Sequence, residues 1–165
     1  MKQEPVRKAL TAREWGFEGA AGRVVISDAR SHGERVTADV VVEMRARGVF
    51  TGRCTVGFAA DELARFHRQL GAMLTGGTRH ATFGDVGDEV ALTIDAAEDG
   101  RTSVTGFVGA GMTTAVSFND LEIDRGSLVR SYLVLDLICR EVGAVAVACG
   151  PGAKQQPPAA APPGA

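Results

Sequence analysis

Apolar residues alternate with mostly polar ones through residues 34–46, and this alternation constrains the fold more than any other feature of the chain. In ERVTADVVVEMRA the apolar set is Val36, Ala38, Val40, Val42 and Met44. Successive side chains of a β-strand point to opposite faces, so the pattern predicts a strand with one buried face and one wet face. Strands of this kind are typical of antiparallel sheets.

Two similar segments flank this strand. GRVVISDA lies before it, beyond a break at 31–33, and VFTGRCTVGF lies after it. The second of these carries one apolar or small set at Phe50, Gly52, Cys54, Val56 and Phe58. Three antiparallel strands in a meander are therefore predicted before residue 60.

The hydrophobic period then changes from two to three and four residues. The apolar positions are Leu63, Phe66, Leu70, Met73 and Leu74. Asp61 and Glu62 fall in the first turn, where the helix dipole favours acids, and Gly76 with Gly77 ends the pattern. A helix is predicted over 60–75.

The rest of the chain predicts about four more strands and a second helix. The strand candidates are RHATFGD, DEVALTIDA, TSVTGFVG and MTTAVSFND. The helix begins near Asp124 and ends before Gly143, and its many apolar residues predict that it is largely buried. The expected fold is α+β: an antiparallel sheet of about seven strands with two helices packed on it, in the order βββαββββα.

The chain length allows one domain with a single core. We expect a polar N-terminal segment at 1–20, one α+β domain at 21–143, and a disordered tail at 144–165. The end of that tail, GPGAKQQPPAAAPPGA, contains five of the six prolines and no large apolar residue. Such a segment buries too little surface to offset its ordering entropy.

Cys54 and His67 lie close together in the sequence and raise the question of catalysis. A cysteine nucleophile needs a base beside it and a third group that orients the base. Cys54 shares a strand face with Val56 and Phe58, and His67 lies at the edge of the helix's apolar side, so core packing and a boundary position explain both. We expect no enzyme, no catalytic residue and no cofactor.

Other motifs are also missing from the sequence. There is no P-loop, no GxSxG, no CxxC, and no histidine pair at metal-ligand spacing; DVGDE lacks the EF-hand pattern. Basic residues are dispersed among acids, which disfavours nucleic-acid binding. The most apolar segment is interrupted by charges, and three cysteines cannot all pair, so we expect no membrane span and a cytoplasmic location.

Charge is strongly segregated along the chain. Residues 81–124 contain nine acids and one base, whereas the segments on either side are net positive. The predicted partner-binding residues come from this segment: Asp85, Asp88, Glu89, Glu98, Asp99, Asp120 and Glu122. Gathered on one surface, these acids would steer a basic protein partner; the alternative is that they only solvate turns and protect sheet edges.

The passage FAADELARFHRQL, with Phe58, Leu63, Phe66 and Leu70, followed by GFV in a later strand, resembles small actinobacterial domains of unknown function related to WapI-like immunity proteins. The resemblance spans residues 15–143. It implies a cytoplasmic protein that binds and neutralises a cognate toxin, often a nuclease. A non-catalytic protein-binding domain is thus the leading hypothesis, a small-ligand-binding domain the alternative, and the oligomeric state is open.

Overall fold

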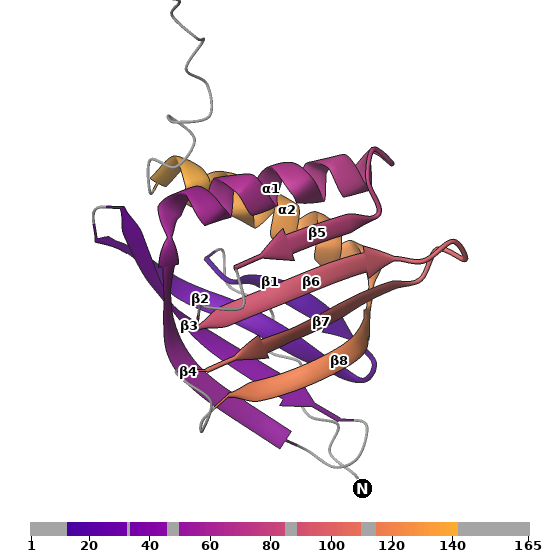
Figure 1. The fold of residues 1–165 in the computed structure, drawn as a ribbon, viewed down its shortest axis with the longest axis horizontal. Helices are drawn as coiled ribbons and strands as arrows, with labels where there is room; N and C mark the ends of the chain where they lie inside the picture. Colours follow the sequence, from indigo (N-terminus) through magenta and orange to yellow (C-terminus); the bar gives the residue numbers. More distant parts are fainter. Residues whose placement is uncertain (1–12, 33, 46–49, 85–88, 110–114, 142–165) are drawn as a thin grey trace, which may run out of the picture.

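The computed structural model describes residues 13–32, 34–45, 50–84, 89–109 and 115–141, and these contain eight strands and two helices (Figure 1). The first half comprises β1 (Trp15–Gly19), β2 (Gly22–His32), β3 (Arg35–Met44), β4 (Phe50–Ala59) and α1 (Ala60–Leu74). The second half comprises β5 (His80–Phe83), β6 (Val90–Ala96), β7 (Thr102–Val108), β8 (Val116–Ile123) and α2 (Arg125–Glu141). The expected tail lies outside the described residues.

The strands form two antiparallel four-stranded sheets, in the orders β1-β2-β3-β4 and β5-β6-β7-β8. The α+β class and the antiparallel meanders are confirmed, but the single sheet of about seven strands is wrong. One additional strand, β1, pairs with β2 from Trp15↔Ile26 to Gly19↔Gly22. Its five residues include two glycines, so its alternation is too short and weak to be read as a strand from the sequence.

Each half of the molecule therefore has the same order, four strands followed by one helix. The helices lie over two sheet edges, the β1 edge of the first sheet and the β5 edge of the second (Figure 1). Each helix packs against the first strand of the other half: α1 against β5, and α2 against β1. Each half of the chain therefore covers the first strand of the other half with its helix.

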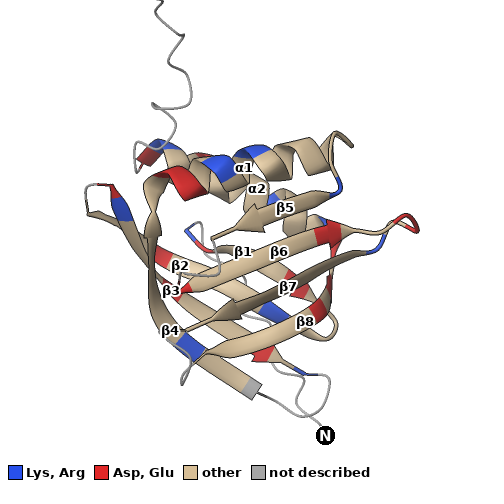
Figure 2. Cartoon of the chain, in the orientation of Figure 1, with Lys and Arg blue, Asp and Glu red and all other residues tan. Residues whose placement is uncertain are grey.

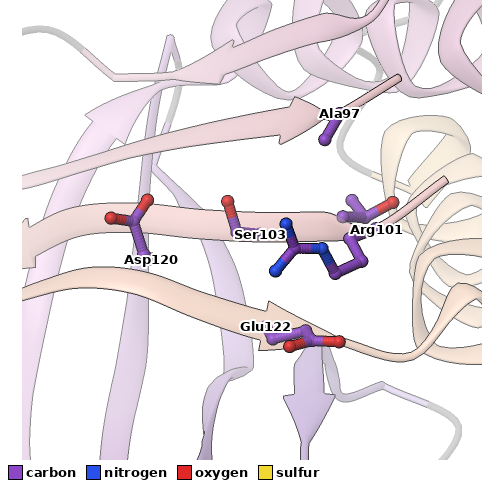
Figure 3. A pocket seen from close by; sticks show the side chains of 6 residues that line it. Ala97, Arg101, Ser103, Asp120 and Glu122 are labelled. Carbon is purple, nitrogen blue, oxygen red and sulfur yellow. The ribbon is translucent and has the colours of Figure 1, made fainter. Parts of the chain in front are cut away.

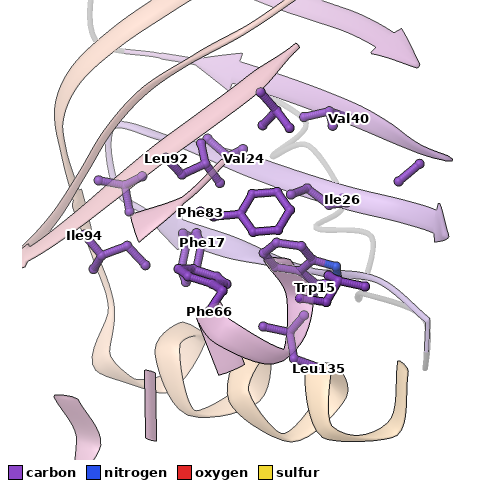
Figure 4. Close-up of a cluster of buried hydrophobic side chains, with 14 of the residues drawn as sticks. Trp15, Phe17, Val24, Ile26, Val40, Phe66, Phe83, Leu92, Ile94 and Leu135 are labelled. Atoms are coloured by element: carbon purple, nitrogen blue, oxygen red, sulfur yellow. The ribbon is translucent and has the colours of Figure 1, made fainter. Parts of the chain in front are cut away.

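One hydrophobic core fills the space between the sheets and the helices. Aromatic rings concentrate beneath the helices, where Trp15 contacts both Phe66 and Phe83 at centroid distances of 5.7 Å and 5.4 Å (Figure 4). Aliphatic side chains of both sheets, such as Ile26 and Leu92, extend this core and are buried. Because β1 supplies Trp15 and Phe17, the strand missed by pattern reading provides two of the largest core side chains.

Side chains of the helices bond the free edges of β1 and β5. On β1, the backbone N–H of Gly16 donates to the Ser131 hydroxyl at 3.0 Å, and that hydroxyl donates to the Gly16 carbonyl. On β5, the backbone N–H of Thr82 donates to Gln69 Oε1 at 2.8 Å, and that of Gly84 donates to Glu62 Oε2 at 3.2 Å. The helices thus satisfy backbone groups that would otherwise form open sheet edges.

The second helix is less buried than expected. Leu128, Leu135 and Ile138 face the core, but Val129, Leu133 and Leu137 are 39%, 58% and 54% exposed. The sequence places apolar residues on several sides of α2, whereas only one side contacts the rest of the described chain. We refer to Val129, Leu133 and Leu137 as the α2 stripe.

Ser131→Ala tests the bonding of the β1 edge. The substitution removes both the acceptor for the Gly16 N–H and the donor to the Gly16 carbonyl in a buried position, so we expect a loss of about 1–3 kcal/mol in the free energy of unfolding. Urea denaturation measures it. Ser117→Ala, at an exposed β8 position, is the matched control and should change stability by less than about 0.5 kcal/mol. Equal effects of the two substitutions would contradict the role of Ser131.

Candidate functional site

Four of the seven predicted partner-binding residues lie at the same end of the second sheet. Glu98 and Asp99 belong to the turn between β6 and β7, and Asp120 and Glu122 lie on β8. Figure 2 shows acidic colouring in this turn, along β8 and at the end of β6, where Asp95 lies. Asp85 and Asp88 are outside the described residues.

Glu89 lies at the opposite end of the second sheet. It immediately precedes β6, whose seven residues separate it from the β6–β7 turn by about 23 Å at the usual rise per residue. Its carboxylate already has an internal partner, because Oε2 accepts the backbone N–H of Gly57 at 2.7 Å. Glu89 therefore joins the second sheet to β4, away from the other four acids.

Strand pairing adds one acid that was not among the predicted residues. The register aligns His80, Asp95, Ser103 and Glu122 in one row across β5 to β8. Neighbouring strands lie about 4.8 Å apart, so Asp95 and Glu122 are two strands apart on the outer face. We refer to Asp95, Glu98, Asp99, Asp120 and Glu122 as the acidic group.

A β-bulge turns Asp120 toward the outer face beside Glu122. The β7–β8 register shifts between Val104 and Gly106, and Asp120 takes a left-handed backbone conformation with φ of 49°. Its backbone N–H donates to Thr105 Oγ1 at 3.0 Å. A bulge places extra residues on one strand and re-aims side chains; here both Asp120 and Glu122 are exposed on β8.

These two carboxylates flank a shallow polar hollow on β7 and β8. Its lining includes Arg101, Ser103, Asp120 and Glu122, and its volume is ≈ 380 Å³ (Figure 3). Arg101 Nε lies 2.7 Å from Asp99 Oδ2, and the bonds from the Arg101 backbone and side chain hold the pKa of the Asp99 carboxyl below its usual value. Arg101, the positive charge nearest the hollow, thus pairs with Asp99 and is also attracted by Glu122, which helps to raise the pKa of the guanidinium.

Most acids on the two outer sheet faces have a basic partner. On the first sheet, Asp39 pairs with Arg53 at 2.6 Å and Glu43 with Arg23 at 2.7 Å, while the exposed Asp28 of β2 takes part in no ion pair among the described residues. On the second sheet, Glu98 and Asp99 pair with Arg79 and Arg101, and Asp95 lies 2.7 Å from His80, a contact that is an ion pair only when the imidazole is protonated.

Asp120 and Glu122 differ from the other members of the acidic group. Within the described ranges, neither carboxylate takes part in an ion pair. They are therefore the acids of this face that remain open to a charged partner.

Cys54 lies apart from the acidic group, on β4. Its side chain is partly buried against the core, and burial raises the pKa of the thiol, with Glu89 and Asp39 adding to the shift. The small depression beside it, lined in part by Val42, Val108 and Val116, has a volume of ≈ 120 Å³. This is well below the roughly 300 Å³ at which ordinary ligand pockets begin.

His67 packs between the two helices. Its ring stacks on Tyr132 with centroids 4.5 Å apart and an angle of 10° between the planes. Burial lowers the pKa of His67 and outweighs the opposing effect of Asp136, whose Oδ1 lies 3.9 Å from Nε2, beyond hydrogen-bond range. The neutral ring acts as a packing element between α1 and α2.

The described ranges contain no cluster of three His, Cys, Asp or Glu side chains able to hold a metal ion. In the same ranges, neither helix has the length and apolar character needed to cross a bilayer.

Cys54 should react slowly with a thiol reagent. In a Cys149→Ser background, the raised pKa keeps the Cys54 thiol protonated near neutral pH, so alkylation by iodoacetamide should be several-fold slower than for a free cysteine peptide. Burial raises the pKa of Cys139 to about 11, so this residue should react only after unfolding. Peptide mass spectrometry measures both rates. Rapid labelling of Cys54 in the folded protein would instead indicate an activated thiol.

His67 should make stability depend on pH. Because its pKa is lower in the folded chain than in the unfolded chain, the unfolded state binds the proton first, and stability falls as pH drops below about 6.5. His67→Asn should be less stable at pH 7 but should lose less further stability between pH 7 and pH 5. Urea denaturation across this range measures the difference, with His32→Asn at an exposed position as control. Parallel curves for the parent and His67→Asn would contradict this coupling.

Comparisons with known proteins add no relative from which a role could be transferred. No protein-family model, curated protein or solved structure matches the chain. Its function must therefore be inferred from its own side chains, charges and contacts.

Proposed function

We propose that this chain is a non-catalytic protein-binding domain that holds a basic protein against the outer face of its second sheet. The observation that carries the proposal is the gathering of five acids at one end of the second sheet. Three of them have a nearby basic partner, whereas Asp120 and Glu122 take part in no ion pair among the described residues. Exposed carboxylates without internal partners are available to a lysine or arginine of another protein.

Three members of the acidic group, Asp95, Asp120 and Glu122, lie on paired strands, which supports this role. Asp95, Ser103 and Glu122 share one row of the sheet, so their spacing is set by backbone hydrogen bonds rather than by a loop. Sites built on regular elements keep their geometry better than sites built on loops. The partner would therefore meet a fixed arrangement of carboxylates.

The hollow beside Asp120 and Glu122 offers a place for one cationic side chain. Ser103 lines it and provides a hydroxyl acceptor, and Arg101 is already bonded to Asp99. A hollow of ≈ 380 Å³ has the volume of a small-ligand site, but it is shallow, and three of its six lining residues, Arg101, Asp120 and Glu122, are charged. Ligand pockets are mostly apolar and enclosed, so a polar protein surface fits this hollow better than a small apolar ligand does.

The negative electrostatic field of the acidic group acts mainly on the rate of association with a basic partner. Complementary charge accelerates encounter and is screened by salt over roughly 8 Å at physiological ionic strength. Within this proposal, the partner is a basic toxin that the chain neutralises by binding in the cytoplasm. Blocking a toxin requires tight contact but no chemistry, which agrees with the packing roles of Cys54 and His67.

Reversal of two acids tests the interface. Glu98→Lys with Glu122→Lys changes the charge of the acidic group without removing a bond to the core, because both side chains are exposed. The matched control is Glu34→Lys with Asp61→Lys, an equal charge change at exposed positions outside the group. Circular dichroism should show that both variants fold.

Each protein is immobilised and exposed to an extract of the cells that produce it, at low and high salt. We expect a basic protein that binds the parent and the control stoichiometrically and is lost from the reversed variant. With that partner purified, the association rate of the reversed variant should fall at least tenfold and lose most of its salt dependence. A partner that binds all three proteins equally would place the interface elsewhere, and its release by enzymatic turnover would refute the non-catalytic role.

A further inference from the structure

The α2 stripe is an apolar surface that the proposed function does not use. Val129, Leu133 and Leu137 are spaced by four residues, which aligns them on one side of a helix over about 12 Å. They are the large apolar residues that remain exposed among the described parts of the chain. Single exposed apolar residues are common, but three in a row on one helix mark a contact surface.

Charges flanking the stripe are divided between the two ends of α2. The N-terminal half carries Arg125 and Arg130, both exposed. The C-terminal half carries Asp136, Arg140 and Glu141, in which Asp136 and Arg140 pair with each other at 2.8 Å. The N-terminal half is therefore positive, and the C-terminal half is left with the charge of Glu141.

From these observations, we propose that the α2 stripe is the contact face of a symmetric dimer in which α2 packs antiparallel against α2 of a second copy. A two-fold axis at Leu133 then sets Val129 of each copy against Leu137 of the other. The positive half of each helix meets the negative half of its partner, whereas a parallel pair would set like halves together. The helix dipoles are also opposed in this arrangement.

The geometry selects one ion pair across the interface. At 100° per residue, Arg130 and Glu141 flank the same side of the stripe, and in an antiparallel pair the same sides of the two helices face each other. With the axis at Leu133, Glu141 of the other copy lies about 7.5 Å from Arg130 along the helix axis, and because helical side chains lean toward their own N-terminus, these two long side chains lean toward each other. Among the described residues of one copy, Glu141 lies 4.0 Å from the exposed Arg13, a surface pair that competes weakly.

A contact centred on three residues is smaller than a standard interface of about 800 Å² per partner, so the dimer is weak and depends on concentration. Sedimentation equilibrium of the full chain from about 5 to about 200 μM spans the range expected for a contact of this size. The parent should approach dimer mass as concentration rises. Leu133→Arg should raise the dissociation constant at least tenfold and keep its circular dichroism, since Leu133 is exposed. Thr51→Arg, on exposed β4, is the control and should dimerise like the parent.

A charge exchange tests the orientation. Arg130→Glu and Glu141→Arg should each weaken the dimer several-fold, and the double variant should recover to within about twofold of the parent, because the pair is restored with its signs reversed. Arg68→Glu, on the exposed side of α1, should have no effect. Failure of the double variant to recover would overturn the antiparallel pairing.

Cysteine cross-linking gives a second test of the same geometry in a Cys54→Ala, Cys149→Ser background. Leu133→Cys should form a disulfide-linked dimer by itself, and a mixture of Val129→Cys with Leu137→Cys should cross-link faster than either variant alone. If Val129→Cys alone or Leu137→Cys alone cross-linked faster than their mixture, the antiparallel arrangement would be overturned. A monomer at every concentration with a protected Leu133→Cys thiol would also overturn the dimer, since another part of the same chain would then cover the stripe.

Discussion

The bonding of sheet edges by side chains from the opposite half is the interaction on which the rest of the structure depends. Ser131 of α2 accepts and donates at Gly16 of β1, and Gln69 of α1 accepts from Thr82 of β5. Glu89 does the same for Gly57 of β4. A sheet of four strands leaves backbone groups open at its edges, and unpaired buried groups are costly. By satisfying them, each half fixes the position of the other, and the aromatic core beneath the helices becomes a shared one.

The sequence predicted the strands and the helix that are recognisable from a local hydrophobic period. The strands at 35–44 and 90–96 alternate clearly, and the helix at 60–74 has both a strong apolar side and acids in its first turn. It did not predict the division into two sheets, because which strands pair is decided by contacts far apart in the chain. It also missed the exposure of Leu133, since an apolar residue on a helix does not reveal which side finds a neighbour.

For the candidate site too, some features were predictable from the sequence and others required the structure. Segregation of acids into 81–124 is visible in the sequence, and four of the acids named there do lie at one end of the second sheet. The contribution of Asp95 required the register, whereas Asp120 was already predicted, and the bulge at Thr105 accounts for its outward position. The internal role of Glu89 depends on β4, a strand from the other half. Which of these acids form one exposed surface can therefore be decided only when their cross-strand neighbours and counter-ions are known.

Because each helix packs on the first strand of the other half, the order of synthesis affects how this chain folds. The hydroxyl that bonds Gly16 is separated from it by 115 residues, nearly the whole described length. At about 5–20 residues per second, β1 is synthesised roughly 6–23 s before Ser131. During that interval Trp15 and Phe17 lack the helix that covers them, and the first sheet keeps an open edge. Completion of the fold must therefore await translation of α2, which makes the nascent first half a natural client for chaperones that shield apolar strands.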